Sequence, residues 1–316
     1  MRLGVLLIHG IGDQGPDWAD AIIRSLEQRV LEQLRSLLDQ PPLDAGSVLR
    51  VGRVHWADVL AKPQRELRRV LDCAHASPTA DGLWWFRLLG TVTGSLRRQE
   101  SRFIAEFIGD VIGYRSPETR QAIYDTITRA LDQLAASLET GSEQAPLTLV
   151  AHSLGSVIAS DYVWDLTKAH RAHPQQGVHD RWRFENFFTV GSPMALFALQ
   201  YGGAAAFNKP IALEHPRGRW VNLYDRDDPL GMPLRPLNEA YRRVVLADAE
   251  VHAGAYLFAH TRYFTNRETL AIISRKLALD WCAQNDQLPA PRWRDLSAAY
   301  DRTLGRLAGV GRPSAR

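Results

Sequence analysis

The chain has 316 residues and a formal net charge of +3, and 45% of its residues are hydrophobic. That length suits one large α/β domain or two small ones, and the composition is ordinary for a protein with a sizeable core. The basic residues are spread along the chain instead of forming a stripe, so we expect no nucleic-acid partner.

Predicted strands and helices alternate along most of the chain. Leu3–Ile8 is a continuous apolar run, typical of a strand buried on both faces of a parallel sheet, and an apolar helical stripe runs from Trp18 to Leu37. Further strands are predicted at 48–56, 147–151, 184–190, 220–224 and 243–246. Further helices are predicted at 116–138, 154–168 and 266–285. This order predicts an α/β fold with a doubly wound, mostly parallel sheet covered by helices on both faces.

Residues 60–118 interrupt this alternation. They contain an aromatic cluster with Trp84 and Trp85, close to several arginines. One interpretation is a lid whose apolar face covers a pocket or touches a lipid surface, and the other is a cap with its tryptophans packed in a core. We therefore predict an α/β domain at 1–288, with 60–118 as a helical cap or lid insertion. The Arg- and Gly-rich tail at 289–316 is expected to be loose.

The two cysteines, Cys73 and Cys282, form neither a disulfide pattern nor a metal-binding pattern. The apolar run at Leu3–Ile8 is too short for the core of a signal peptide, and no segment has the roughly 20 apolar residues of a membrane span. We expect a reduced, cytoplasmic protein, with peripheral membrane contact through the insertion as an open alternative.

The segment LTLVAHSLGS contains the first candidate for chemistry. Ser153 stands between a predicted strand and a predicted helix. A nucleophilic serine on a sharp strand–turn–helix needs small residues two positions before and after it, and here these are Ala151 and Gly155. The alternative is that Ser153 only caps the helix.

A glycine-rich loop, His9-Gly10-Ile11-Gly12, follows the first predicted strand. Backbone N–H groups of such a loop can point at an oxyanion beside a nucleophile, and we expect Ile11 and Leu154 to supply the two donors. The alternative is a glycine-rich turn with no role in chemistry. The loop lacks the glycine spacing of a dinucleotide site and the lysine of a phosphate-binding loop.

An acid and a base follow in the order that a Ser–acid–His triad of this kind requires. Asp228 is our choice for the carboxylate because its Asp-Pro-Leu lies just past a predicted strand, while Asp225 and Asp227 stay open as alternatives. His260 is our choice for the base because it lies in a loop before a helix, after the last predicted strand. His252 is the alternative.

With these elements in place, the chain resembles an α/β-hydrolase of the serine lipase and esterase kind. The resemblance covers roughly residues 2–12 and 116–284, and it is carried by LLIHGIG, VAHSLGS, TVGSPMALF, WVNLYDRDDPLG and AHTRYF. Around the nucleophile the chain is similar to intracellular phospholipase-like and GPI-deacylase-like hydrolases. The resemblance implies a sheet of the α/β-hydrolase type and a Ser153–Asp228–His260 triad. It also implies acyl transfer to water with no metal or organic cofactor.

The resulting hypothesis is a serine hydrolase of carboxylic esters, with lipid esters as a candidate substrate. We expect substrate to contact His9, Gly10 and Gly12 of the loop and Trp84 and Trp85 of the insertion. One alternative is a non-catalytic module of the same fold that binds a lipid or a protein. Another is an acyltransferase that shares the acyl-enzyme. Oligomeric state is left open.

Overall fold

The computed structural model describes residues 1–10, 15–61, 66, 107–138, 144–172, 181–213, 215–254 and 257–308. Contacts divide the chain into two compact units. The first holds the described residues of Met1–Gly10, Pro16–Val54 and from Thr128 onward, and the second holds Gly15 and the described residues of His55–Ile127. Most of the insertion predicted at 60–118 lies outside the described residues, so the domain boundaries stay a prediction.

The first unit is built on a six-stranded sheet in the order β2-β1-β3-β4-β5-β6. All neighbouring strands are parallel. The strands are β1 (Leu3–Ile8), β2 (Leu49–Val54), β3 (Ala145–His152), β4 (Trp182–Val190), β5 (Arg219–Tyr224) and β6 (Val245–Glu250). The predicted parallel sheet is therefore confirmed.

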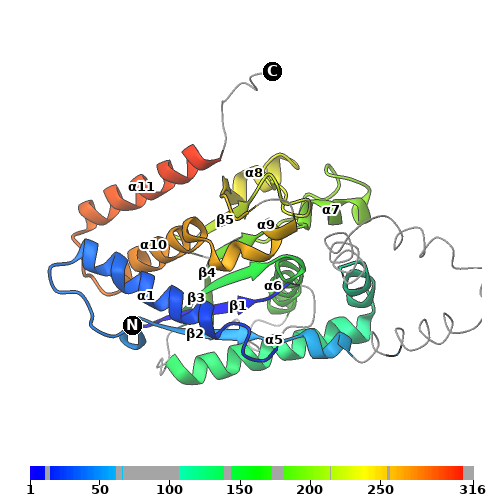
Figure 1. The fold of residues 1–316 in the computed structure, drawn as a ribbon, viewed down its shortest axis with the longest axis horizontal. Helices are drawn as coiled ribbons and strands as arrows, with labels where there is room; N and C mark the ends of the chain where they lie inside the picture. The colour runs from blue at the N-terminus through cyan, green and yellow to red at the C-terminus, as the bar shows by residue number, and fades with distance from the viewer. Residues whose placement is uncertain are drawn as a thin grey trace, which may run out of the picture. The chain divides into compact units, whose positions relative to one another are not determined.

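Helices cover the sheet on both sides, as Figure 1 shows: α1, α10 and α11 lie over one face, and α6 with the part of α5 from Thr128 onward lies over the other. The helices are α1 (Asp20–Leu37), α5 (Pro117–Leu138), α6 (Leu154–Ala172), α7 (Met194–Phe197), α8 (Glu239–Val244), α9 (Leu257–Arg262), α10 (Arg267–Gln284) and α11 (Ala290–Leu307). Three short 3-10 turns complete the described elements: η1 (Ala45–Ser47), η4 (Ala198–Tyr201) and η5 (Tyr263–Thr265). Among the described residues, no helix is long and apolar enough to cross a membrane.

Alternating side chains of β1 pack into the cores on opposite faces of the sheet. All six of its residues are buried, as the apolar run predicts. Val5 and Leu7 belong to the core under α1 and α10, whereas Leu6 meets α5, because a Cβ added at Gly52 would lie 3.2 Å from Leu6 and 3.5 Å from Leu134. Helices on both faces thus bury the centre of the sheet, at the point where the strand order reverses between β1 and β3. Ligand sites of such sheets lie at the carboxyl ends of the strands beside this reversal.

Two sequence expectations are corrected near the C-terminus. The last strand begins at Val245 and not at residue 243, because Asn238 caps the short helix α8 by accepting a hydrogen bond from the Tyr241 amide. The tail expected to be loose contains α11, whose Tyr300 and Leu304 are buried in the core beneath it. Its helical apolar spacing was hidden by the surrounding arginines, and residues 309–316 lie outside the described part.

A buried ion pair lies on α10. The Lys276 ammonium contacts Asp280 one turn later, and the two residues are 3% and 5% exposed. Asp280 also accepts a hydrogen bond of 2.8 Å from Asn186 on β4, which in turn donates to Thr148 on β3 at 3.0 Å. Because each charge is desolvated, each depends on the other. The network ties α10 to the sheet.

Removing one partner of this pair tests that dependence. We expect Lys276→Met to lower the free energy of unfolding by about 3–5 kcal/mol, because it leaves a buried carboxylate without its cation. The double variant Lys276→Met with Asp280→Leu is expected to be more stable than Lys276→Met alone. Urea unfolding followed by circular dichroism measures both. If the free energy of unfolding of Lys276→Met lies within about 1 kcal/mol of the wild-type value, the buried carboxylate does not depend on its cation.

Candidate active site

Ser153 occupies a strained turn between β3 and α6. Its φ angle is 52°, one of two positive values among the described non-glycine residues, and its side chain is fully buried. The amide of Ser153 donates to the carbonyl of Val190 at 2.9 Å, which anchors the turn to the end of β4. Left-handed backbone at a residue with a side chain costs energy and persists only where packing holds it. This is the strand–turn–helix that the sequence predicts for a nucleophilic serine.

Small residues around the turn allow β1 to approach it closely. A Cβ on Gly155 would lie 2.2 Å from the carbonyl oxygen of His9, and a Cβ on Gly10 would lie 2.6 Å from the Cβ of Ser153. Ala151, two residues before Ser153, is completely buried. The end of β1 and the start of α6 therefore touch backbone to backbone beside the serine.

Ser153, His260 and Asp228 form one continuous hydrogen-bonded chain. The Ser153 Oγ lies 2.8 Å from His260 Nε2. On the far side of the ring, Nδ1 lies 3.0 and 2.9 Å from the two carboxylate oxygens of Asp228. An ionised carboxylate only accepts, so Nδ1 carries the proton and Nε2 accepts from the serine hydroxyl. The structure brings together all three residues that we selected from the sequence, on the turns after β3 and β5 and on α9.

The alternative acids and base lie in other surroundings. Asp225 accepts hydrogen bonds from the backbone amides of Asp227 at 2.9 Å and Ala253 at 2.6 Å, so it holds the loop after β5 to the end of β6. Asp227 is exposed. The His252 side chain is 83% exposed and pairs with Glu268 at 3.5 Å. These positions leave Asp228 and His260 as the acid and base candidates.

Tyr263 is a site residue that sequence reasoning missed. It is fully buried, and its hydroxyl donates to Asp228 Oδ2 at 2.8 Å while accepting the Asp225 amide at 2.8 Å. Burial by itself would raise the pKa of the Asp228 carboxyl, but hydrogen bonds from His260, the Leu230 amide and Tyr263, with the charge of His260, hold this pKa below its ordinary value. Asp228 therefore stays ionised. The available signal was the spacing of Tyr263, one helical turn after His260.

His152 was also missed, although it stands directly before the serine. Its Nε2–H donates to the backbone carbonyl of His260 at 2.7 Å, and the two rings lie 4.9 Å apart. Burial, and next the neighbouring charge of His260, lower the pKa of His152 to about 3. The ring therefore stays neutral in ordinary buffers, and it positions the backbone of His260 without adding a positive charge beside it.

The glycine-rich loop after β1 is described only as far as Gly10. His9 is 2% exposed, and its Nδ1–H donates to the Gly10 carbonyl at 2.7 Å. The ring of His9 meets Trp18 edge-on at 5.2 Å. Leu154 is the first residue of α6, where no preceding helical turn accepts its amide. The other residues predicted to bind substrate or an oxyanion, Ile11, Gly12, Trp84 and Trp85, lie outside the described residues.

Asp248 on β6 anchors the loop that carries Asp228. Its two oxygens accept the amides of Leu234 at 2.8 Å and Arg235 at 2.9 Å. Asn222 on β5 donates to the same carboxylate at 2.8 Å. The loop after β5 is thus held at both ends, by Asp225 and by Asp248. Among the described residues, no group of His, Cys, Asp and Glu side chains forms a metal site.

Comparisons with known proteins add little to this geometry. No family model matches the chain, and no match was found among curated proteins. A solved structure from Xanthomonas campestris pv. campestris, described as a "putative hydrolase of the alpha/beta superfamily", is 16% identical over 88% of this chain and 96% of its own, with a TM-score of 0.32. The parallel six-stranded sheet with helices on both faces is the doubly wound α/β architecture that the sequence predicts.

The close approach at Gly155 can be tested by adding one methyl group. We expect Gly155→Ala to lower stability markedly and to weaken labelling of Ser153 by a fluorophosphonate, because the new Cβ collides with the His9 carbonyl. Gly305→Ala on α11 is the matched control, since its Cβ meets open space, and it is expected to stabilise the protein by about 1 kcal/mol. Thermal unfolding measures both. Equal behaviour of the two variants would contradict the steric argument.

Proposed function

We propose that this protein is a serine hydrolase that cleaves carboxylic esters through an acyl-enzyme on Ser153, with His260 as the base and Asp228 as its orienting carboxylate. The observation that carries the proposal is the hydrogen-bonded chain from Ser153 Oγ through His260 to Asp228 on a left-handed turn. A serine hydroxyl is a weak nucleophile at neutral pH, and an adjacent, oriented imidazole is the usual means of activating it.

The proposed reaction has two half-reactions. Ser153 Oγ attacks the ester carbonyl carbon while its proton passes to His260 Nε2, and the tetrahedral oxyanion forms. The oxyanion collapses and expels the alcohol, which takes the proton from His260, so that an acyl-enzyme remains. Water then gives a proton to His260 and attacks the acyl group, and the second collapse returns the proton to Ser153 and releases the acid. Asp228 stabilises the imidazolium in both steps.

The oxyanion is the second requirement of this reaction. The Leu154 amide lies at the N-terminus of α6, next to the nucleophile, where the helix dipole also favours negative charge. The second donor in the proposal is the Ile11 amide. The close packing of Gly10 against Ser153 supports this assignment, because it brings the end of β1 to the nucleophile. Lipid esters are the substrate class that the family resemblance favours.

A covalent probe tests the proposal directly. We expect a fluorophosphonate to add one adduct to the wild type, seen by intact mass, and none to Ser153→Ala, which lacks the attacking oxygen. His260→Ala is expected to label at least about a hundredfold more slowly because the base is gone. His252→Ala is the matched control, since this exposed histidine pairs with Glu268 and not with the candidate triad, and it should label like the wild type.

Absence of any adduct on folded wild-type protein, both alone and with lipid or detergent, would contradict the proposal. It would favour a module that binds lipid or protein without catalysis. If labelling succeeds, product analysis with an ester series and a competing alcohol separates hydrolysis from acyl transfer.

Tyr263 predicts how activity depends on pH. Its hydroxyl draws charge from Asp228, so Tyr263→Phe leaves that carboxylate a stronger partner for the His260 imidazolium. We therefore expect the acid limb of the kcat/KM profile to move to higher pH. The activity at its maximum is expected to stay within about tenfold of the wild type.

Tyr241→Phe is the control for that profile. Tyr241 is equally buried, but its hydroxyl donates to the Met194 sulfur at 3.8 Å and not to Asp228, so its removal should leave the acid limb in place. If Tyr263→Phe lowers stability without moving the acid limb of the profile, the hydroxyl is merely structural. Its assigned influence on the Asp228–His260 pair would then be wrong.

A further inference from the structure

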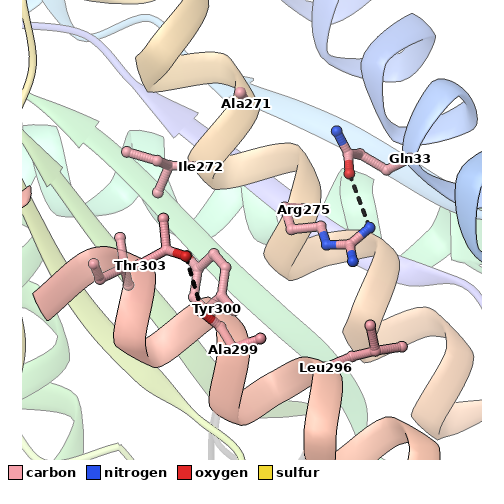
Figure 2. A pocket seen from close by; sticks show the side chains of 9 residues that line it. Gln33, Ala271, Ile272, Arg275, Leu296, Ala299, Tyr300 and Thr303 are labelled. Atoms are coloured by element: carbon pink, nitrogen blue, oxygen red, sulfur yellow. Dashed lines mark hydrogen bonds between the residues drawn. The ribbon is translucent and has the colours of Figure 1, made fainter. Parts of the chain in front are cut away.

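A pocket of about 320 Å³ lies between α1, α10 and α11, on the face of the sheet that these helices cover. Figure 2 shows its walls: Ile272 and Arg275 come from α10, Ala299 and Tyr300 from α11, and Gln33 from α1. Apart from Arg275, Gln33 and Thr303, the side chains that line it are apolar or aromatic. The volume is near the lower end of the range of roughly 300–1,000 Å³ that small-molecule pockets occupy. None of the candidate triad residues lines it.

Arg275 is the charged group of this pocket, and it is only partly satisfied. Its Nη1 donates to Gln33 Oε1 at 3.1 Å and to Ser36 Oγ at 3.4 Å, which are both neutral acceptors. Among the described residues, no carboxylate pairs with this guanidinium, although arginines elsewhere in the same unit, such as Arg219 with Asp301, have one. Burial lowers the pKa of Arg275, as expected for a half-buried cation without a counter-ion.

The unused part of the guanidinium has the geometry of an anion site. All hydrogen bonds that Arg275 makes within the described residues come from Nη1, so the parallel N–H groups of Nε and Nη2 have no protein acceptor there. In Figure 2 this edge lies on the side of the guanidinium away from Gln33. An Nε–Nη2 edge donates two parallel hydrogen bonds that match the two oxygens of a carboxylate.

We propose that this pocket binds a small amphiphilic monocarboxylate, with its carboxylate on the Nε–Nη2 edge of Arg275 and its aliphatic tail against Ile272, Leu296 and Leu304. Each part of the ligand is complementary to one part of the pocket. The carboxylate neutralises a half-buried cation, whose desolvation is otherwise uncompensated. The tail packs against the apolar wall of the pocket, and each methylene buried there should raise the affinity roughly threefold to fourfold.

The site is separate from the proposed catalytic centre. The inference rests on the pocket alone and stands whether or not Ser153 is a nucleophile. If the proposed ester cleavage is correct as well, the acid that it releases belongs to the class of molecules that fits here.

Calorimetric titration with sodium octanoate at neutral pH tests the inference. The wild type is expected to show saturable binding, and Arg275→Gln should weaken it roughly tenfold to a hundredfold, because a charged hydrogen-bonded pair is lost. Ala299→Leu places a larger side chain in the pocket and should weaken binding while Arg275 stays in place. Arg302→Gln is the matched control: Arg302 is an exposed residue of α11 that does not line the pocket, so its removal changes the net charge equally and should leave affinity unchanged.

Octanamide has the same tail without the charge, so we expect it to bind the wild type more weakly than octanoate does. Its affinity for the wild type and for Arg275→Gln should be equal. Thermal unfolding of each variant shows whether it is folded. Equal octanoate affinity in the wild type, Arg275→Gln and Ala299→Leu would overturn the inference. Octanoate would then bind at another site, for example beside Ser153. No saturable binding to the wild type would overturn it as well.

Discussion

A buried carboxylate needs hydrogen-bond donors, and Asp228 receives its donors from three different places in the chain. His260 comes from α9, Tyr263 from η5, and the Leu230 amide from the loop that follows β5. Gly191 and Gly231 leave the space for this assembly, since a Cβ at either position would collide with Tyr263 or with Asp228 itself. The need to compensate one charge therefore decides how the ends of β4 and β5 meet the segment from α9 to η5.

The same principle acts on a second carboxylate beside the site. Asp225 is buried and takes backbone amides as its donors, which fastens the loop after β5 to the start of the segment after β6. Because its amide donates to Tyr263, the two aspartates are linked through one hydroxyl. A shift in either loop would break a hydrogen bond to a buried carboxylate. Hydrogen bonds as well as side-chain packing therefore fix the positions of the triad candidates.

Elsewhere in the first unit, buried charged groups have two kinds of partner. Lys276 and Asp280 compensate each other on α10 and are further satisfied by the sheet. Arg275, on the same helix, has neutral partners within the described part of the chain and borders a pocket. The Lys276–Asp280 pair therefore contributes to the fold, whereas the Nε–Nη2 edge of Arg275, which has no acceptor among the described residues, can still bind an anion.

The sequence by itself determined the parallel sheet, the turn at Ser153 and the chain order of the candidate serine, acid and histidine. These features have local signals: a doubly buried strand is a continuous apolar run, and a sharp turn needs small residues at fixed positions, as at Ala151 and Gly155. Only the tertiary structure separated Asp228 from Asp225 and Asp227, and His260 from His252. It also placed Tyr263 and His152 in the site and turned the expected loose tail into α11. The physical reason is that strand and turn signals arise between near neighbours in the chain, whereas the partner of a buried charge comes from a distant segment that only folding brings near.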